Sequence, residues 1–259
     1  SYPTLEIVQD GAVRHVRLNR PDVRNAFNGQ VVEDLQAAFA EVDADPSTRV
    51  VVLSGNGKSF SAGADLTWMQ EQASLPHADN RAGAERMARM FLAIARCRKP
   101  VVGRIHGHAL GGGTGLTAAV DIALCSDDCQ FGLTEVKLGI VPAVISPFVL
   151  QKIGVGRART LFLTGERFDG SEAMRIGLVH RAVPIGSLDA AVQQVVGELL
   201  AAGPAAVASA KELIRAVGAL PLEDAIPITA TWIADLRATP EAKEGFAAFL
   251  GKRKPNWIG

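Results

Sequence analysis

Three features of the sequence predict an α/β fold. Short apolar runs of strand length alternate with longer segments of helical periodicity from the N-terminus to about Val183. The chain has 259 residues, of which 48% are hydrophobic and 21% are charged, as in a globular protein that buries a core of its own. Beyond Val183, prolines and capping residues introduce a series of helices. We therefore expect strands that pair at least partly in parallel, followed by a mainly helical last third.

The first two thirds of the chain supply the strands. Asp10-Gly11 between two alternating runs predicts a β-hairpin, and Asn28 is placed to cap the helix that follows. A buried strand ends at the turn Gly55-Asn56-Gly57, and a later strand leads into the glycine-rich stretch from Gly107 to Gly115. The predicted strands run over 5–8, 13–18, 49–54, 100–105 and 121–125, and the predicted helices over 28–42, 79–95 and the segment before 121.

The last third is predicted from helix start signals. Leu188, Val192, Val195 and Leu199 recur at helical spacing. Two prolines, Pro204 and Pro221, stand where a first helical turn can begin, and Thr239-Pro240 is a cap followed by proline at the first position. These signals divide the chain into an α/β core over residues 1–195 and a C-terminal helical region over residues 196–259.

Charge and cysteine content narrow the function classes. Lys+Arg and Asp+Glu number 27 each, so no bulk field would attract nucleic acid or an anionic membrane. Cys97, Cys125 and Cys129 are odd in number and form no C-x-x-C motif, which suits a reducing compartment. Together with the absence of a leader pattern and of a long apolar run, this predicts a cytoplasmic protein. The scattered histidines predict no metal site.

The glycine-rich stretches fail the nucleotide-binding tests. The dinucleotide fingerprint needs a small residue where the chain has Leu116, and a phosphate loop needs a lysine where it has Gly113. Neither a G-x-S-x-G elbow nor an H-E-x-x-H motif occurs. The same stretches can still expose main-chain donors, because small residues admit a ligand close to the backbone and a helix N-terminus has free N–H groups. Two such turns, Ser61 to Asp65 and Leu110 to Thr114, could form an oxyanion hole or could simply be tight turns.

Five segments resemble, in collinear order, the signatures of the enoyl-CoA hydratase/isomerase (crotonase) family. Together they span nearly the whole chain, and that combination is highly specific. The segments are Asn19-Arg20-Pro21 with Asn25-Ala26-Phe27, Gly57 to Leu66, His106 to Gly113, Phe131 to Glu135 with Leu138 to Pro142, and Glu244-Gly245 through Phe249-Leu250 to Lys254.

This resemblance implies a crotonase-like spiral of ββα units with a C-terminal helical trimerisation region, assembled as trimers or hexamers. It implies an acyl-CoA thioester as substrate, with coenzyme A entering as part of that substrate and no separate cofactor. By position, the N–H groups of Ala64 and Gly112 would hold the thioester oxygen, and Glu135 would be the catalytic carboxylate. The matched substrate-binding positions are Arg24, Ala26, Ala62, Gly63, Asp65, Leu66, His108, Leu110, Gly111, Thr134, Phe249 and Lys252. The last two would reach the nucleotide end, within the same chain or across a subunit boundary.

One departure from the family pattern concerns the catalytic acids. Hydratases of the family carry a second glutamate where this chain has Gly115, and Asp121 reads as a structural aspartate. The apolar neighbours of Glu135 should raise the pKa of its carboxyl toward the range of a general acid/base. A single carboxylate suffices for an isomerase that moves one proton between two carbons, whereas a hydratase must also hold a water.

The sequence favours hydratase over isomerase through a finer resemblance. Glu135 to Gly139 with Pro142 to Phe148 resembles the methylglutaconyl-CoA hydratase-like branch, which acts on branched, carboxylated enoyl-CoA esters in leucine and isoprenoid breakdown. The substrate's own carboxylate, His108 or a basic group would then position the water. A third interpretation, from another class, is a non-catalytic acyl-CoA carrier or an RNA-associated protein; Glu135 and the zero net charge weigh against it.

Overall fold

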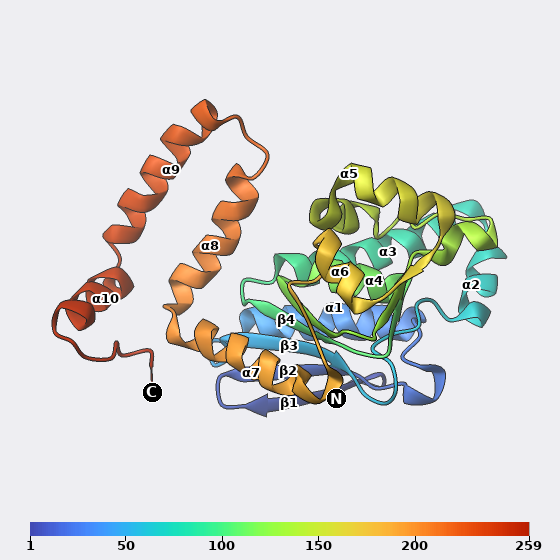
Figure 1. Cartoon of the computed structure of the whole chain (residues 1–259), viewed down its shortest axis with the longest axis horizontal. Helices are drawn as coiled ribbons and strands as arrows, with labels where there is room; N and C mark the ends of the chain where they lie inside the picture. The colour runs from blue at the N-terminus through green and yellow to red at the C-terminus, as the bar shows by residue number, and fades with distance from the viewer. Residues whose placement is uncertain (259) are drawn as a thin grey trace.

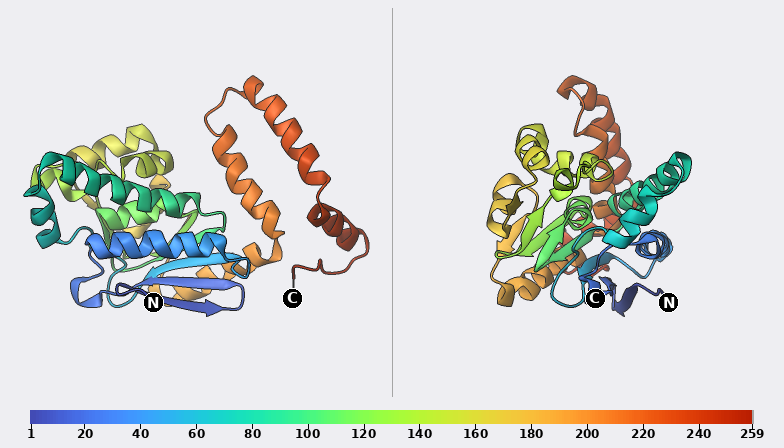
Figure 2. Two further views of the ribbon diagram at one scale, coloured as in Figure 1. Left: turned by 180° about the vertical axis from the view of Figure 1, so that it is seen from behind. Right: turned by 90° about the vertical axis from the view of Figure 1, so that its right-hand side faces the viewer.

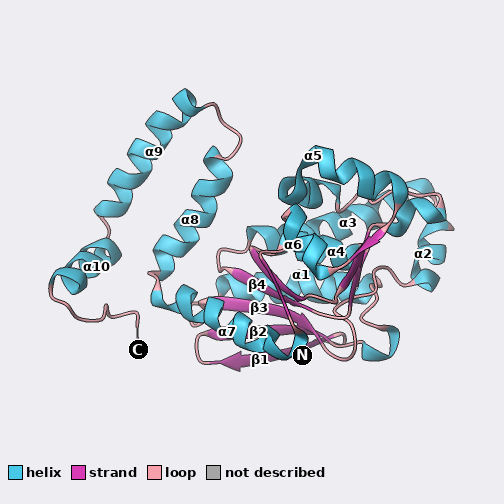
Figure 3. Cartoon of the chain, in the orientation of Figure 1, coloured by secondary structure: helices cyan, strands magenta, loops and turns pink. Residues whose placement is uncertain are grey.

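The structure is a computed structural model that describes residues 1–258 (Figures 1 and 3). Its strands are β1 (Leu5–Asp10), β2 (Val13–Leu18), β3 (Val50–Gly55), β4 (Val101–Ile105), β5 (His108–Leu110), β6 (Ile122–Ser126), β7 (Gln130–Gly132), β8 (Arg167–Phe168) and β9 (Arg181–Val183). Its helices are η1 (Pro21–Val23), α1 (Gly29–Ala44), α2 (Leu66–Ala73), α3 (His77–Arg96), α4 (Gly112–Ala119), η2 (Thr134–Leu138), α5 (Ser146–Thr164), α6 (Gly170–Ile176), α7 (Ile185–Ala201), α8 (Pro204–Val217), α9 (Leu222–Arg237) and α10 (Pro240–Leu250).

The larger sheet has six strands in the order β1-β2-β3-β4-β6-β9. The first pair is the antiparallel hairpin that Asp10-Gly11 predicts, and every other pair in this sheet is parallel. The central strand β3 is buried along its whole length, as a parallel strand covered on both faces should be. The predicted α/β class with parallel pairing is confirmed.

A second, smaller layer lies beside the larger sheet and explains the ββα repeat. It contains β5, β7 and β8, and two isolated bridges extend it, one between Phe27 and Ala64 and one between Ser61 and Ala109. After β2, β3, β4 and β6, the chain therefore crosses to the second layer before it enters a helix. Each repeat places one short segment in this layer, and two of these segments carry the glycine-rich turns.

Helices cover both faces of the larger sheet (Figures 1 and 2). Alternate residues of β3 point to opposite sides: Val51 and Leu53 join the main core with α1, α3, α4 and α5, whereas Val50 and Val52 pack against α7. Asn28 caps α1 as predicted, since its Oδ1 accepts a hydrogen bond of 3.0 Å from the Val31 N–H.

The C-terminal helices α8, α9 and α10 form an arm that projects from the core (Figure 1). The predicted division at residue 195 falls inside α7, whose Val195 still packs on the sheet, so the arm begins with α8. Pro204 and Pro240 occupy first turns as predicted, whereas Pro221 is the residue before α9.

Asp121 anchors this arm, which agrees with the structural role that the sequence analysis gives it in place of a catalytic one. Its Oδ2 accepts a hydrogen bond of 2.7 Å from the Val101 N–H and lies 2.6 Å from the Lys211 Nζ of α8. Lys211 Nζ also donates to the carbonyl oxygens of Cys97 and Lys99. One lysine thus joins the arm to the segment that precedes β4.

The cysteines, the potential metal ligands and the hydropathy of the helices can be described for residues 1–258. Within them, all three cysteines are free and buried, and burial raises the pKa of the Cys97 thiol to about 11 and that of Cys125 to about 12. They therefore behave as core residues and not as nucleophiles. The same residues contain no cluster of three or more potential metal ligands. No single described helix has the length and hydropathy of a membrane span; α7 and α8 meet that test only as a pair bent by 104°.

Candidate active site

The two glycine-rich turns lie against each other through main-chain contacts. The Ser61 N–H donates to the His108 carbonyl and the Leu110 N–H donates to the Ser61 carbonyl, each at 3.0 Å. Gly63 has φ of +91°, and a Cβ atom there would lie 2.8 Å from the Leu110 carbonyl oxygen. Both the backbone conformation and the close approach therefore require glycine at this position.

Each turn presents a main-chain donor without a partner. Around Ala64, Phe27 N–H donates to the Gly63 carbonyl and Asp65 N–H donates to the Phe27 carbonyl, both at 2.7 Å, but the Ala64 N–H meets no acceptor among residues 1–258. Gly112 is the first residue of α4, so its N–H has no acceptor within the helix, and it has none elsewhere in the described chain. These are the two donors that the sequence singles out.

Glu135 supplies a carboxyl group beside the second turn. It lies in η2, and a Cβ atom built at Gly111 would be 3.1 Å from its Oε1. Within residues 1–258 its Oε2 is buried and has no hydrogen-bond partner. Desolvation raises the pKa of this carboxyl, against a smaller opposing effect of its own backbone N–H. The shift has the direction and the cause that the apolar neighbours predict.

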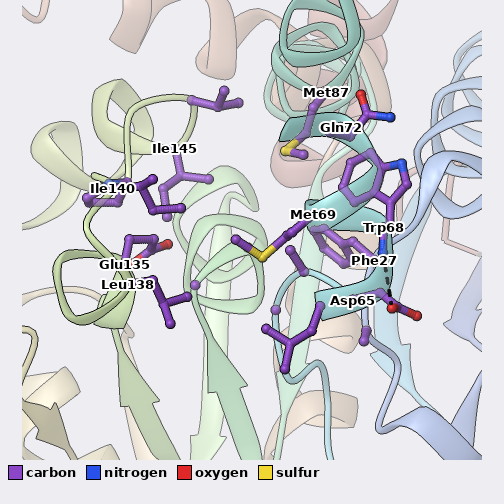
Figure 4. A pocket seen from close by; sticks show the side chains of 18 of the residues that line it. Phe27, Asp65, Trp68, Met69, Gln72, Met87, Glu135, Leu138, Ile140 and Ile145 are labelled. Atoms are coloured by element: carbon purple, nitrogen blue, oxygen red, sulfur yellow. Dashed lines mark hydrogen bonds between the residues drawn. The ribbon is translucent and has the colours of Figure 1, made fainter. Parts of the chain in front are cut away.

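These groups share one cavity of about 690 Å³ (Figure 4). In the close-up, Glu135 lies among Leu138, Ile140 and Ile145. Helices α2 and α3 form the facing wall with Trp68 and Met87. The predicted site residues that line the cavity are Ala26, Ala62, Gly63, Ala64, Asp65, Leu66, Leu110, Gly111, Gly112, Thr134 and Glu135.

Asp65 has a local structural role in addition to its place in the lining. Its Oδ1 accepts hydrogen bonds from the N–H groups of Thr67 and Trp68, so it caps α2. Its Oδ2 lies 3.5 Å from Arg20 Nη2. The carboxylate of Asp65 is thus already satisfied within the chain, and Glu135 is the carboxyl that remains available for chemistry.

Two of the predicted binding residues lie outside the cavity. His108 is half-buried, its Nδ1 lies 3.2 Å from Ser59 Oγ, and it is not among the residues that line the cavity. The reason is that β5 continues for two residues beyond His108 before it reaches the turn. Arg24 is exposed, and its hydrogen bonds are those of its main chain: its N–H donates to the Pro21 carbonyl at 3.0 Å and its carbonyl accepts from the Ala62 N–H at 2.9 Å.

Phe249 and Lys252 also lie away from the cavity of their own chain. Phe249 is 83% exposed near the end of α10, and Lys252 follows that helix. Figure 1 shows α10 at the far end of the arm from α2 and α3. Within one chain these two residues do not reach the site.

The sequence did not predict much of the cavity lining. The walls include Trp68, Met69 and Gln72 of α2, a helix that was not predicted because it has eight residues and buries none of them. The start of α2 could have been predicted from Asp65, since an aspartate directly before Leu66-Thr67-Trp68 is a typical N-cap. Ile145 was recognised only as part of a motif, and its contact with α4 could not be read from the sequence.

The site has a net acidic lining. Among residues 1–258, the charged side chains that line the cavity are those of Asp65 and Glu135, and no Lys, Arg or His joins them. Two free N–H donors and the Glu135 carboxyl face a space whose lining is mainly apolar. Such an arrangement can stabilise developing negative charge on an oxygen while a proton moves at a neighbouring atom.

Asn25 holds the loops that build this site. It is 1% exposed with φ of +55°, its Nδ2 donates to the carbonyls of Asn56 and Ser59 at 2.9 Å each, and its Oδ1 accepts from the Arg20 N–H. Asn25→Ala should lower the free energy of unfolding by about 3 kcal/mol, because one buried and two partly buried polar groups lose a partner. Denaturant unfolding measures this. Asn19→Ala, at an exposed position, is the control and should change stability by less than about 0.5 kcal/mol; equal effects would contradict the role given to Asn25.

Comparisons with known proteins agree with this geometry. The sequence profile described as enoyl-CoA hydratase/isomerase matches residues 9–259. A crotonyl-CoA hydratase of Syntrophomonas wolfei is 32% identical, with 100% of this chain and 99% of the relative aligned. A peroxisomal Delta(3,5)-Delta(2,4)-dienoyl-CoA isomerase of Arabidopsis thaliana is 34% identical over 99% of this chain and 98% of its own. The crystal structure of an enoyl-CoA hydratase from Shewanella pealeana superposes with a TM-score of 0.94 at 35% identity, covering 98% of this chain and 96% of that one.

Proposed function

The chain belongs to the enoyl-CoA hydratase/isomerase family, and on that basis we propose that it is an enoyl-CoA hydratase, which adds water across the 2,3 double bond of an acyl-CoA thioester. The observation that carries the proposal is the half-buried Glu135, whose Oε2 is buried and unpartnered, in the same cavity as two unpartnered N–H groups of residues 1–258. The collinear family signatures and the hydratases among the relatives support it.

The proposed mechanism divides the work between backbone and side chain. The N–H groups of Ala64 and Gly112 donate to the thioester oxygen, where enolate charge builds up; one such donor typically lowers the barrier by about 3–4 kcal/mol. Glu135 takes a proton from water while the water oxygen forms its bond to carbon 3. The same carboxyl then returns the proton to carbon 2 as the enolate collapses, so that the atoms of one water are added and Glu135 is regenerated.

This mechanism makes activity depend on pH through Glu135. The carboxylate form is the base, and burial raises its pKa above the ordinary value of 4.5. The value of kcat/KM, which reports ionisation of the free enzyme, should therefore fall as pH decreases through that raised pKa, with its acidic limb at a pH above 4.5. A pH profile with crotonyl-CoA, at pH values where the fold is intact, measures the limb. An acidic limb at or below the ordinary carboxyl value would contradict the assignment.

For the acyl group we propose a branched chain, with 3-methylglutaconyl-CoA as the carboxylated candidate. The resemblance of residues 135–148 to the methylglutaconyl-CoA hydratase-like branch supports both features. The apolar walls around Glu135 support branching. A distal carboxylate would meet no cationic side chain in the lining that residues 1–258 of one chain provide, so the charged ester needs a separate test.

A second candidate is a 3,2-enoyl-CoA isomerase, which Glu135 could support alone. The specific observation in its favour is that the cavity contains no second carboxyl beside Glu135 within the described chain other than the capping Asp65. The similarity to a dienoyl-CoA isomerase is consistent with this alternative. An isomerase would transfer one proton between two carbons and would need no bound water.

One spectroscopic assay distinguishes these functions. The purified protein is mixed with crotonyl-CoA, 3-methylcrotonyl-CoA, 3-methylglutaconyl-CoA and a 3-enoyl-CoA. Loss of the conjugated absorbance shows hydration, and its appearance from the 3-enoyl ester shows isomerisation. No turnover of any ester would contradict both enzyme functions and would favour an acyl-CoA carrier.

We further propose that the arm mediates assembly into trimers, or hexamers built from them. Large apolar residues are exposed along it, among them Leu222 at 82%, Ile226 at 65% and Leu250 at 80%. In such an assembly Phe249 and Lys252 would serve the cavity of a neighbouring subunit. Sedimentation should give three or six times 27.3 kDa, and Ile226→Asp should reduce the mass; a wild-type monomer would contradict the proposal.

A further inference from the structure

The absence of a side chain at position 115 has a structural cause. Gly115 lies in α4, one turn after Gly112. A Cβ atom at Gly115 would lie 2.4 Å from Ile145 Cγ2, 2.9 Å from Ile145 Cβ and 3.1 Å from Phe91 Cε1. These distances are well below van der Waals contact, and two of the atoms belong to the branched base of Ile145, which cannot swing aside as the end of a long side chain can. Position 115 can therefore carry no side chain while Ile145 keeps its place.

Ile145 is held firmly in that place. It is 4% exposed and immediately precedes α5, and its carbonyl accepts hydrogen bonds of 3.1 Å from the N–H groups of both Phe148 and Val149. Its side chain fills the space above Gly115 and also lines the cavity close to Glu135 (Figure 4). The same apolar group thus packs against α4 and faces the substrate space.

We infer that Ile145 is a specificity-determining residue, which occupies the room that a side chain at position 115 would need and presents an apolar surface to the substrate beside Glu135. The inference rests on the proposed function and refines it. The favoured substrate class is an enoyl-CoA with an apolar substituent near its reacting carbons, whose size is limited by Ile145. The pair Gly115 and Ile145 also leaves Glu135 without a second carboxyl on the α4 side.

The first test measures substrate selectivity. The ratio of kcat/KM for an enoyl-CoA with an ethyl group at carbon 3 to that for the 3-methyl ester is determined for the wild type and for Ile145→Ala. The ratio should rise about tenfold in the variant, because the removed carbons leave room for the larger group. Ile145→Val should move the ratio in the same direction but less. Ile153→Ala, a buried isoleucine of α5 outside the cavity, should leave it unchanged. A ratio in Ile145→Ala equal to that of the wild type would overturn the inference.

The second test needs no activity and so separates this inference from the proposed function. Gly115→Ala should lower the melting temperature of the wild type, but in the Ile145→Gly background, which removes both Ile145 atoms within 3 Å of the added Cβ, the same substitution should cost less than half as much. An equal loss in both backgrounds would show that Ile145 does not determine what position 115 can hold. If the wild type turned over none of the esters, the proposed function would fail, whereas this double-mutant cycle would still decide the packing of the pair.

Discussion

Glu135→Gln is expected to lower kcat by about 10²–10⁴-fold, the range typical for removal of a general acid/base. Glutamine keeps the shape of the side chain but cannot take a proton from water or return one to carbon. The carboxyl is the only protonatable group that the described cavity presents besides the capping Asp65. Steady-state kinetics on the best ester of the panel measure the change, and the affinity for coenzyme A should stay within about twofold because the backbone donors are untouched.

The free energy of unfolding of Glu135→Gln should not fall together with its activity. Burial raises the pKa of Glu135 in the folded state, so the unfolded chain loses this proton first as pH rises. The ionised carboxyl therefore costs stability at pH values above its folded pKa and costs none below its unfolded pKa. Glu135→Gln should be at least as stable as the wild type at pH 7. Glu166→Gln, at an exposed position, is the matched control and should keep full activity. Normal turnover in Glu135→Gln would remove the carboxyl from the mechanism.

Gly112→Pro should reduce kcat by a further 10²–10³-fold, on the order of one oxyanion donor, relative to Gly112→Ala. Proline is tolerated at the first position of a helix and lacks the N–H that is proposed to bind the thioester oxygen. Both substitutions add a Cβ atom, which would lie 2.6 Å from the Phe27 ring, so steric damage is common to the pair.

The comparison between the two Gly112 variants tests the N–H group against a shared steric background. Circular dichroism and thermal unfolding show whether both fold alike, and the ratio of their kcat values then reports the replacement of the N–H group by the proline ring. If alanine and proline at position 112 gave the same kcat, the amide of Gly112 would not be part of the oxyanion site. In that case Ala64 would have to act with another donor of the first turn of α4.

The elements that the sequence predicted are those governed by local rules. The hairpin at Asp10-Gly11, the Asn28 cap and the parallel strands depend on turn chemistry, capping and apolar spacing, and all are present. The fold family followed from collinear signatures and is confirmed by the profile match and the structural superposition. The finer methylglutaconyl-like branch stays a prediction.

The parts that the sequence did not predict depend on contacts between distant segments. Helix α2 buries no residue of its own, so it lacks the apolar periodicity by which a helix is found. His108 was expected to line the cavity, but where the ring points depends on Ser59, which comes from another repeat. The gap left at Gly115 was visible in the sequence, whereas its cause, the side chain of Ile145 thirty residues later, required the fold.

The bridge between Ser61 and Ala109 has a consequence for how this enzyme would respond to mutational scanning. The bridge sets the register of two main-chain segments. The proposed oxyanion-hole donors are the N–H groups of Ala64 and Gly112, which belong to those segments. Replacing side chains one at a time with alanine would leave Ala64 as it is and would report only crowding at Gly112. Such a scan would single out Glu135 and pass over its partners, so that two of the three proposed catalytic groups would be visible only to proline substitution or backbone chemistry.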